Sequence, residues 1–181
     1  MEKYAIALIF DKCKELDKIN EFLKKYNLNY VNNYFHITLA GFECDDENYL
    51  IEKIKDFANT HNQIKIRFSH LGTFLTEDNV VFMSPFHSNQ LFKYHKDLKR
   101  AICSKKDIIL CPYYKGKIWN PHCSIAYKIP HEIYIDIINN LSSVIEFPFE
   151  ANISKIDIYE YSSKKEKIFE TNLKKSRKNS N

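Results

Sequence analysis

Two five-residue stretches of this chain, HITLA (36–40) and HCSIA (122–126), share the pattern His-x-[Thr/Ser]-aliphatic-Ala. Each lies in an apolar run that predicts a β-strand, and each run is followed by a pattern that predicts a helix. None of the other five histidines has such a setting. A duplicated strand-then-helix unit, with one copy in each half of the chain, is the simplest explanation.

The remaining hydrophobic patterns extend this arrangement into a single α+β domain. Unbroken or alternating apolar runs predict strands at 4–10, 35–42, 64–71, 79–85, 122–127, 147–153 and 155–161. Apolar residues at helical spacing predict helices at 14–26, from Asp45 or Asp46 to about 59, from Ser88 to about 102, and from Pro130 to about 141. Because no linker divides them, we expect one bilobal domain over residues 1–161, its two halves related in layout.

The chemistry of the repeat follows from strand geometry. Alternate side chains of a strand share a face, so His36 lies beside Thr38, and His122 beside Ser124. If the two strands meet around a pseudo-twofold axis, two imidazoles and two hydroxyls converge on one pocket. Two imidazoles can act as general base and general acid on a phosphodiester. Two hydroxyls can donate hydrogen bonds to its non-bridging oxygens.

Composition excludes several other classes of protein. Only three glycines are present, and neither GxGxxG nor GxxxxGK[ST] occurs, which argues against glycine-rich phosphate loops. The five cysteines form no CxxC pair, which favours a reducing compartment over a disulfide framework or a zinc knuckle. The apolar run YAIALIF is too short for a membrane span and lacks a signal-peptide cleavage site. We therefore expect a cytoplasmic protein with no membrane partner.

The basic residues are concentrated at the C-terminus. Seven of them between Lys164 and Lys178 face only Glu166 and Glu170, a local net charge of +5. We interpret residues 162–181 as a basic, partly disordered tail. A weak, salt-sensitive contact of this tail with nucleic acid is the alternative.

These features resemble the 2H phosphoesterase superfamily, whose members carry paired H-x-[ST]-h motifs about half a chain apart. The stretch YYKGKIWNPHCSIAY is similar to the second-motif region of its bacterial "2'-5' RNA ligase family" members. The resemblance implies a bilobal fold in which antiparallel sheets line a central cleft, with the helices outside. It also implies catalysis by His36, Thr38, His122 and Ser124.

The same resemblance implies a class of reaction and no cofactor. It indicates turnover of 2',3'-cyclic phosphates or 2',5'-linked nucleotides without a metal. We expect a monomer that acts on RNA or a small nucleotide. We expect His36 to act as the base and His122 as the acid, although near-symmetry permits the reverse. Nothing in the chain, such as an ATP-binding loop, supports ATP-driven ligation.

Aromatic and basic residues near the motifs are candidates for substrate binding. They are Phe42, Tyr113, Tyr114, Lys115 and Trp119. Aromatics in such a loop commonly cover the edge of a core. Alternatively, one of them stacks on a base or a ribose, with Phe42 as a wall of the cleft and Lys115 screening phosphates.

Two other interpretations of the function remain open. The first is a non-catalytic RNA- or nucleotide-binding module that retains the pocket. The second is a zinc site of histidine and cysteine, which the spacing does not support. We interpret His95 as a core residue on a helical stripe, and Cys123 as a small core residue on the face opposite His122.

Overall fold

The computed structural model describes residues 1–26, 34–115, 118–162 and 166–175 of the chain. The strands are β1 (Glu2–Phe10), β2 (His36–Cys44), β3 (Ile64–Phe74), β4 (Val80–Pro85), β5 (Ile109–Leu110), β6 (Cys123–Ala126), β7 (Phe149–Glu160) and β8 (Glu166–Asn172). The helices are α1 (Lys14–Lys24), α2 (Glu47–Thr60), α3 (Asn89–Ile102) and α4 (His131–Val144), with a short 3-10 turn η1 (Pro112–Tyr114). The predicted α+β class and the order of the long elements are confirmed. In the loop before the second motif, β5 and η1 were not expected.

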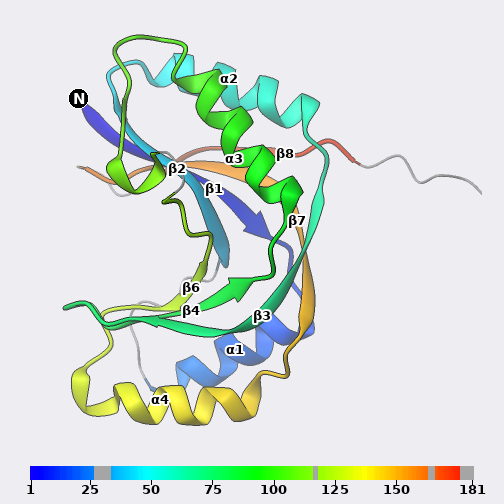
Figure 1. The fold of residues 1–181 in the computed structure, drawn as a ribbon, viewed down its shortest axis with the longest axis vertical. Coiled ribbons are helices and arrows are strands. Elements are labelled where there is room, and N and C mark those ends of the chain that lie inside the picture. Colours follow the sequence, from blue (N-terminus) through cyan, green and yellow to red (C-terminus); the bar gives the residue numbers. More distant parts are fainter. Residues whose placement is uncertain (27–33, 116–117, 163–165, 176–181) are drawn as a thin grey trace, which may run out of the picture.

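One antiparallel sheet runs through the whole molecule, where separate sheets were expected. Its order is β5-β2-β1-β7-β3-β4-β6, with β8 paired to β7 as well. The motif strands β2 and β6 therefore lie toward opposite ends of the sheet. The sheet is bent so strongly that β6 comes back beside β2, as Figure 1 shows, and the two strands are in contact. This bend brings the two halves of the repeat together.

Two pairs of helices cover the outside of the bent sheet. Helices α2 and α3 pack together over the part that contains β1, β2 and β7, and α1 and α4 pack together over the part that contains β3, β4 and β6 (Figure 1). The side chains of Asp46 and Ser88 cap α2 and α3 by accepting bonds from the backbone N–H groups of Tyr49 and Leu91. Both caps agree with the predicted helix starts. Among the described residues, no helix has the length and apolar character needed to cross a membrane.

Both motif strands carry a one-residue bulge at the same place in the motif. On β2, Thr38 lies opposite Ala7 and Ala40 lies opposite Ile6, so Leu39 has no partner on β1. On β6, Ser124 lies opposite Phe82 and Ala126 lies opposite Val81, which leaves Ile125 without a partner on β4. A bulge reverses the faces of all residues beyond it. The aliphatic residue and the alanine of each motif are thus both buried, whereas the histidine and the hydroxyl-bearing residue are only partly buried.

The predicted boundary of the tail is wrong. Residues 166–172 form β8, which pairs with β7 along its length, from Lys155↔Asn172 to Glu160↔Glu166. Further along, the N–H of Leu173 bonds to the carbonyl of Ser154, and Leu173 is buried in the core. The strand was missed because β8 is an exposed edge rich in charge, and charged residues are how edges avoid pairing with other chains. The predicted disorder of residues 176–181 lies outside the described residues.

A close contact between Gly72 and Phe82 shapes the wall of the cleft beside β6. The two residues lie opposite each other on β3 and β4. A Cβ atom at Gly72 would lie only 2.4 Å from the tip of the Phe82 ring. The ring therefore lies directly over this glycine, next to Phe74, at a ring-centre distance of 4.4 Å.

We expect Gly72→Ala to destabilise the protein by about 1–3 kcal/mol, because the Phe82 ring must move away from its place. Chemical denaturation of the variant measures this cost. Thr73→Ala, at the exposed neighbouring position, is the matched control and should have little effect. In a Phe82→Ala background the cost of Gly72→Ala should largely disappear, and an unchanged cost there would contradict the proposed contact.

Candidate active site

The first motif holds His36 in one defined orientation. The residue opens β2 and is half-buried. Its Nδ1 lies 3.1 Å from the backbone carbonyl of Tyr34. A carbonyl only accepts hydrogen bonds, so Nδ1 carries the proton and the neutral ring has its lone pair on Nε2. Nε2 is therefore the atom available for proton transfer.

The second motif repeats this arrangement. His122 lies immediately before β6, and its Nδ1 donates to the carbonyl of Asn120 at 2.8 Å. In both motifs the acceptor is the carbonyl two residues before the histidine. The repeat in the sequence thus produces a repeat in side-chain geometry. In both rings Nδ1 is bonded to the backbone, and Nε2 is the nitrogen available for proton transfer.

The pKa values of both imidazoles are lowered from their ordinary value, chiefly because burial disfavours the charged ring. His122 is packed against Phe74 and Phe82, with ring centres 4.9 and 5.4 Å away. The positive charge of His122 lowers the pKa of His36 further. The two motifs therefore lie close enough in space for the charge on one ring to affect the titration of the other.

Two adjoining cavities contain the two histidines. The larger, of about 650 Å³, is lined by His36, and the smaller, of about 440 Å³, is lined by His122. Three residues line both cavities and so mark their junction: Thr38, Tyr113 and Tyr114. A group bound at this junction would have one imidazole on either side.

The two motif hydroxyls differ in their surroundings. Thr38 lines both cavities, together with Tyr114. Burial raises the pKa of Tyr114 to about 12, so its phenol stays protonated at neutral pH and is a possible hydrogen-bond donor. Ser124 is half-buried on β6 opposite Phe82 and lines neither cavity. Of the four predicted catalytic residues, His36, Thr38 and His122 line the cavities and Ser124 does not.

The predicted substrate-binding residues divide into three groups. Tyr113 and Tyr114 line both cavities, and Trp119 lines the smaller one although only 6% of it is exposed. Lys115 is exposed and lines neither cavity. The expectation that Phe42 walls the cleft is wrong, since it is 1% exposed within the core.

The bulge at Leu39 explains the error at Phe42. Strict alternation from His36 would direct Ala40 and Phe42 into the cleft. The extra residue reverses the faces, so Gly41 lies at the cavity and Phe42 points into the core. A Cβ at Gly41 would lie 3.0 Å from the ring of Tyr114, so a glycine at this position leaves room for the tyrosine ring.

His95 and Trp119 form a clamp that joins the two motifs. Their rings stack with centres 4.0 Å apart and planes 12° apart. His95, on α3, donates from Nδ1 to the carbonyl of Leu39 at 2.6 Å. The indole N–H of Trp119, three residues before His122, donates to the carbonyl of Thr38 at 3.2 Å. His95 is thus a core residue, as interpreted from the sequence, and its contacts hold Leu39 and Trp119 in position next to the two motifs.

The sequence analysis missed most of the lining of the larger cavity. Four further tyrosines line it, at positions 34, 127, 159 and 161, and its floor is formed by Ala5 and Ala7. One signal was present: alanine at alternate positions of the otherwise bulky run YAIALIF marks one face of β1 as open. The tyrosines carry no such signal, because they come from separate segments.

A buried acid supports one of these tyrosines. Asp157, 2% exposed, accepts a hydrogen bond from the hydroxyl of Tyr159 at 3.2 Å and lies 3.6 Å from the ammonium of Lys167 on β8. Tyr159 in turn lies beside His36, with ring centres 6.4 Å apart. Lys167 also lies over the ring of Tyr34, whose carbonyl orients His36. Strand β8 therefore supports the His36 side of the cleft.

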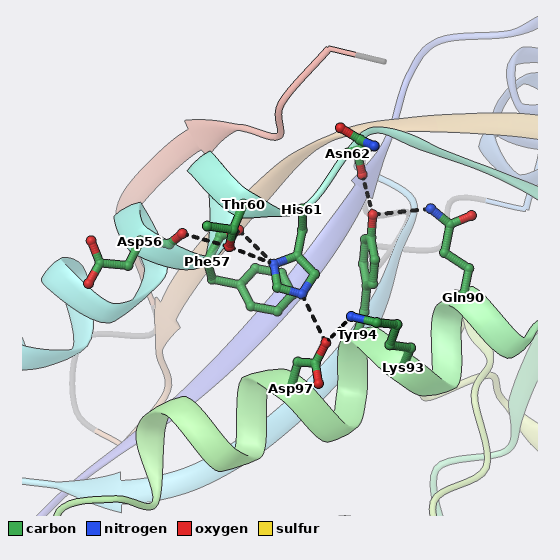
Figure 2. A network of polar contacts seen from close by, with 9 residues as sticks. All are labelled: Asp56, Phe57, Thr60, His61, Asn62, Gln90, Lys93, Tyr94 and Asp97. Carbon is green, nitrogen blue, oxygen red and sulfur yellow. Dashed lines mark hydrogen bonds and ion pairs between the residues drawn. The ribbon is translucent and has the colours of Figure 1, made fainter. Parts of the chain in front are cut away.

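A polar network around His61 lies outside the cleft, between α2 and α3 (Figure 2). His61 bonds through Nδ1 to the carbonyl of Phe57 at 2.9 Å, and through Nε2 to Asp97 at 3.2 Å. It also stacks on the Phe57 ring. These contacts hold the end of α2 against α3, which is a structural role. Across the described residues, no group of three or more histidine, cysteine or acidic side chains has the geometry of a metal site.

Comparison with known proteins agrees with this fold. The model of the 2'-5' RNA ligase superfamily matches residues 11–165. A search of curated proteins gives no match. The structure of the Thermus thermophilus protein TT0787 is similar, at 13% identity and a TM-score of 0.65, over 96% of this chain and 99% of that one.

Two further structures show the same fold. Escherichia coli LigT in its apo form is 13% identical at a TM-score of 0.57, over 97% of this chain and 100% of that one. Kluyveromyces marxianus Usb1 is 9% identical at a TM-score of 0.54, over 96% and 98% of the two chains. Other LigT structures hold 3'-AMP, NADP+ or ATP.

We expect both imidazoles to titrate below the ordinary pKa of 6.5. Replacing His122 by Gln removes a positive charge, so the pKa of His36 should rise toward 6.5 in that variant. NMR titration of the imidazole resonances measures both effects. His87→Gln, at an exposed position that lines neither cavity, is the control and should leave the titration of His36 unchanged. A His36 pKa that does not respond to His122→Gln would contradict the closeness of the two rings.

Proposed function

This chain belongs to the 2'-5' RNA ligase superfamily, and we propose that it is a metal-independent phosphodiesterase acting on cyclic 2',3'- or 2',5'-linked nucleotide phosphodiesters. The observation that carries the proposal is the matched pair of imidazoles. Both donate Nδ1–H to a backbone carbonyl, and both line cavities that meet at Thr38. The nucleotides bound in the structures of LigT support a nucleotide as the ligand.

The junction at Thr38 is the proposed place for the phosphate. A phosphodiester there would have His36 on one side and His122 on the other. In-line displacement requires the attacking and leaving oxygens to lie on opposite sides of the phosphorus atom. Two imidazoles on opposite sides of one phosphate meet this requirement, because each Nε2 faces one apical oxygen.

We assign His36 as the general base and His122 as the general acid. The nucleophile gives its proton to Nε2 of His36, and Nε2 of His122 gives a proton to the leaving oxygen. The charge of a protonated His122 lowers the pKa of His36, so the two rings disfavour being charged together. A pair with one protonated and one neutral imidazole has the acid and the base that this scheme needs.

Hydroxyl groups stabilise the transition state in this scheme. The Thr38 hydroxyl is placed to donate to a non-bridging oxygen, and the protonated phenol of Tyr114 lies beside it. Ser124 is the corresponding hydroxyl-bearing residue of the second motif, and it lines neither cavity. Donors of this kind stabilise charge as it develops on the phosphate.

We expect His36→Ala and His122→Ala each to lower kcat by about 10²–10⁴-fold, because each removes one proton transfer. The assay is turnover of 2',3'-cyclic nucleotides and 2',5'-oligoadenylates, with identification of the products. Turnover should persist in EDTA and should depend on pH as a bell, with an acid limb from His36 and a basic limb from His122.

His70→Ala is the matched control, since His70 lies exposed on β3 and lines neither cavity. Activity that EDTA abolishes while both histidine variants retain it would refute the scheme. Tight nucleotide binding without turnover, unaffected by either histidine variant, would instead indicate a non-catalytic binding module.

A further inference from the structure

The two cavities on either side of Thr38 have different linings. The larger one, which contains His36, is lined by six tyrosines and floored by small residues. The smaller one, which contains His122, is lined by Phe74, Val80, Ile118 and Trp119. A substrate that is held at the junction therefore meets a different surface on each side of its phosphate.

Each cavity is large enough to hold a group of its own. Ligand sites in proteins generally measure about 300–1,000 Å³, and the two cavities measure about 650 and 440 Å³. The floor of the larger cavity is open because Ala5, Ala7 and Gly41 stand there in place of bulky residues. The small residues of β1 and β2 thus leave the space that the larger cavity occupies.

The smaller cavity is apolar where it reaches solvent. Ile118, on its rim, is 65% exposed, and Leu75, next to the lining residue Phe74, is 83% exposed. Exposed apolar side chains beside a cavity favour a ligand that covers them. Phe74, Tyr113 and Tyr114 also line this cavity, and they are aromatic side chains of the kind on which nucleic-acid bases stack.

The described residues that line the two cavities supply no cation for additional phosphates. Among the described residues that line them there is no lysine or arginine. Binding of a chain of phosphates depends on such cations. The linings fit a substrate whose bound portion carries a single diester charge, held by imidazoles and hydroxyls.

From these observations we infer that the substrate is an open-chain phosphodiester with a nucleoside-sized group on each ester oxygen, rather than a cyclic mononucleotide. The inference rests on the proposed function. One nucleoside occupies the tyrosine-lined cavity, and the leaving nucleoside occupies the apolar cavity beside His122. A 2',3'-cyclic mononucleotide would leave the apolar cavity empty, because its leaving oxygen stays on the same ribose.

The reaction on such a substrate is balanced by the two imidazoles. The oxygen of a water molecule or of a neighbouring ribose hydroxyl forms a bond to phosphorus, and its proton passes to Nε2 of His36. The bond from phosphorus to the leaving oxygen breaks, and that oxygen receives the proton of Nε2 of His122. The leaving nucleoside departs as an alcohol from the apolar cavity, and no other reactant is needed.

The wild-type protein provides the first test. We expect kcat/KM for 2',5'-linked diadenosine monophosphate to exceed that for adenosine 2',3'-cyclic phosphate by about tenfold or more, from the added stacking of one base. Equal values, or a preference for the cyclic substrate, would overturn this inference and leave the proposed function intact. Cleavage of neither substrate would contradict the proposed function itself.

Cavity-filling variants provide the second test. Val80→Phe reduces the space in the apolar cavity, so it should lower the ratio of the two kcat/KM values, diester over cyclic, toward one. Ala5→Leu fills the tyrosine-lined cavity, which both substrates use, and should lower both values while changing their ratio less. Ile135→Phe, at an exposed position on α4, adds an aromatic ring away from both cavities and is the control.

Thermal unfolding checks that each variant is folded before its kinetics are compared. A Val80→Phe protein that is folded and keeps the wild-type ratio would refute the assignment of the apolar cavity to the leaving group. If Val80→Phe does not fold, Ile118→Ala, at an exposed position on the same rim, provides the alternative and should lower the ratio by loss of contact.

Discussion

The geometry of the site depends on how the bulge at Leu39 is stabilised. The bulge removes Leu39 from the pairing of β2 with β1, and an unpaired backbone carbonyl in a core costs free energy unless it finds another donor. His95 supplies that donor, and the stack of His95 on Trp119 extends the contact to the second motif. The stacked pair of His95 and Trp119 thus stabilises the irregular strand and fixes the position of one motif relative to the other.

The sequence predicted the positions of the long helices and strands well. It predicted only in part which side chains of β2 point into the cleft and which into the core. The repeat, the strand and helix periodicities and the caps at Asp46 and Ser88 all act locally, so they can be recognised from neighbouring residues. The bulge cannot, because the partner that satisfies Leu39 lies 56 residues away on α3. That is why Phe42 was expected in the cleft and Gly41 was not. The same limit applies to the tyrosines, which the bend of the sheet gathers from separate segments.

The repeat is symmetrical in its backbone and asymmetrical in its surroundings, and that difference suits the different roles proposed for the two histidines. Each imidazole bonds to the carbonyl two residues before it. Phe74 and Phe82 pack against His122, whereas Tyr159 lies beside His36 above a floor of alanine. An acid and a base need unlike environments around like groups. The residues around the two motifs differ, so the two imidazoles have unlike environments although the motifs themselves are alike.

Strand β8 belongs to the His36 half of the site. Burying the carboxylate of Asp157 is costly, and the Oδ1 atom of this residue has no hydrogen-bond partner among the described residues. Burial raises the pKa of Asp157, and the neighbouring ammonium of Lys167 opposes that rise. Because Lys167 comes from β8, the strand that the sequence suggested was a loose tail compensates part of this cost. Asp157 holds Tyr159 beside His36 and takes its ammonium partner from β8, so the part of the chain that supports the cleft includes this strand.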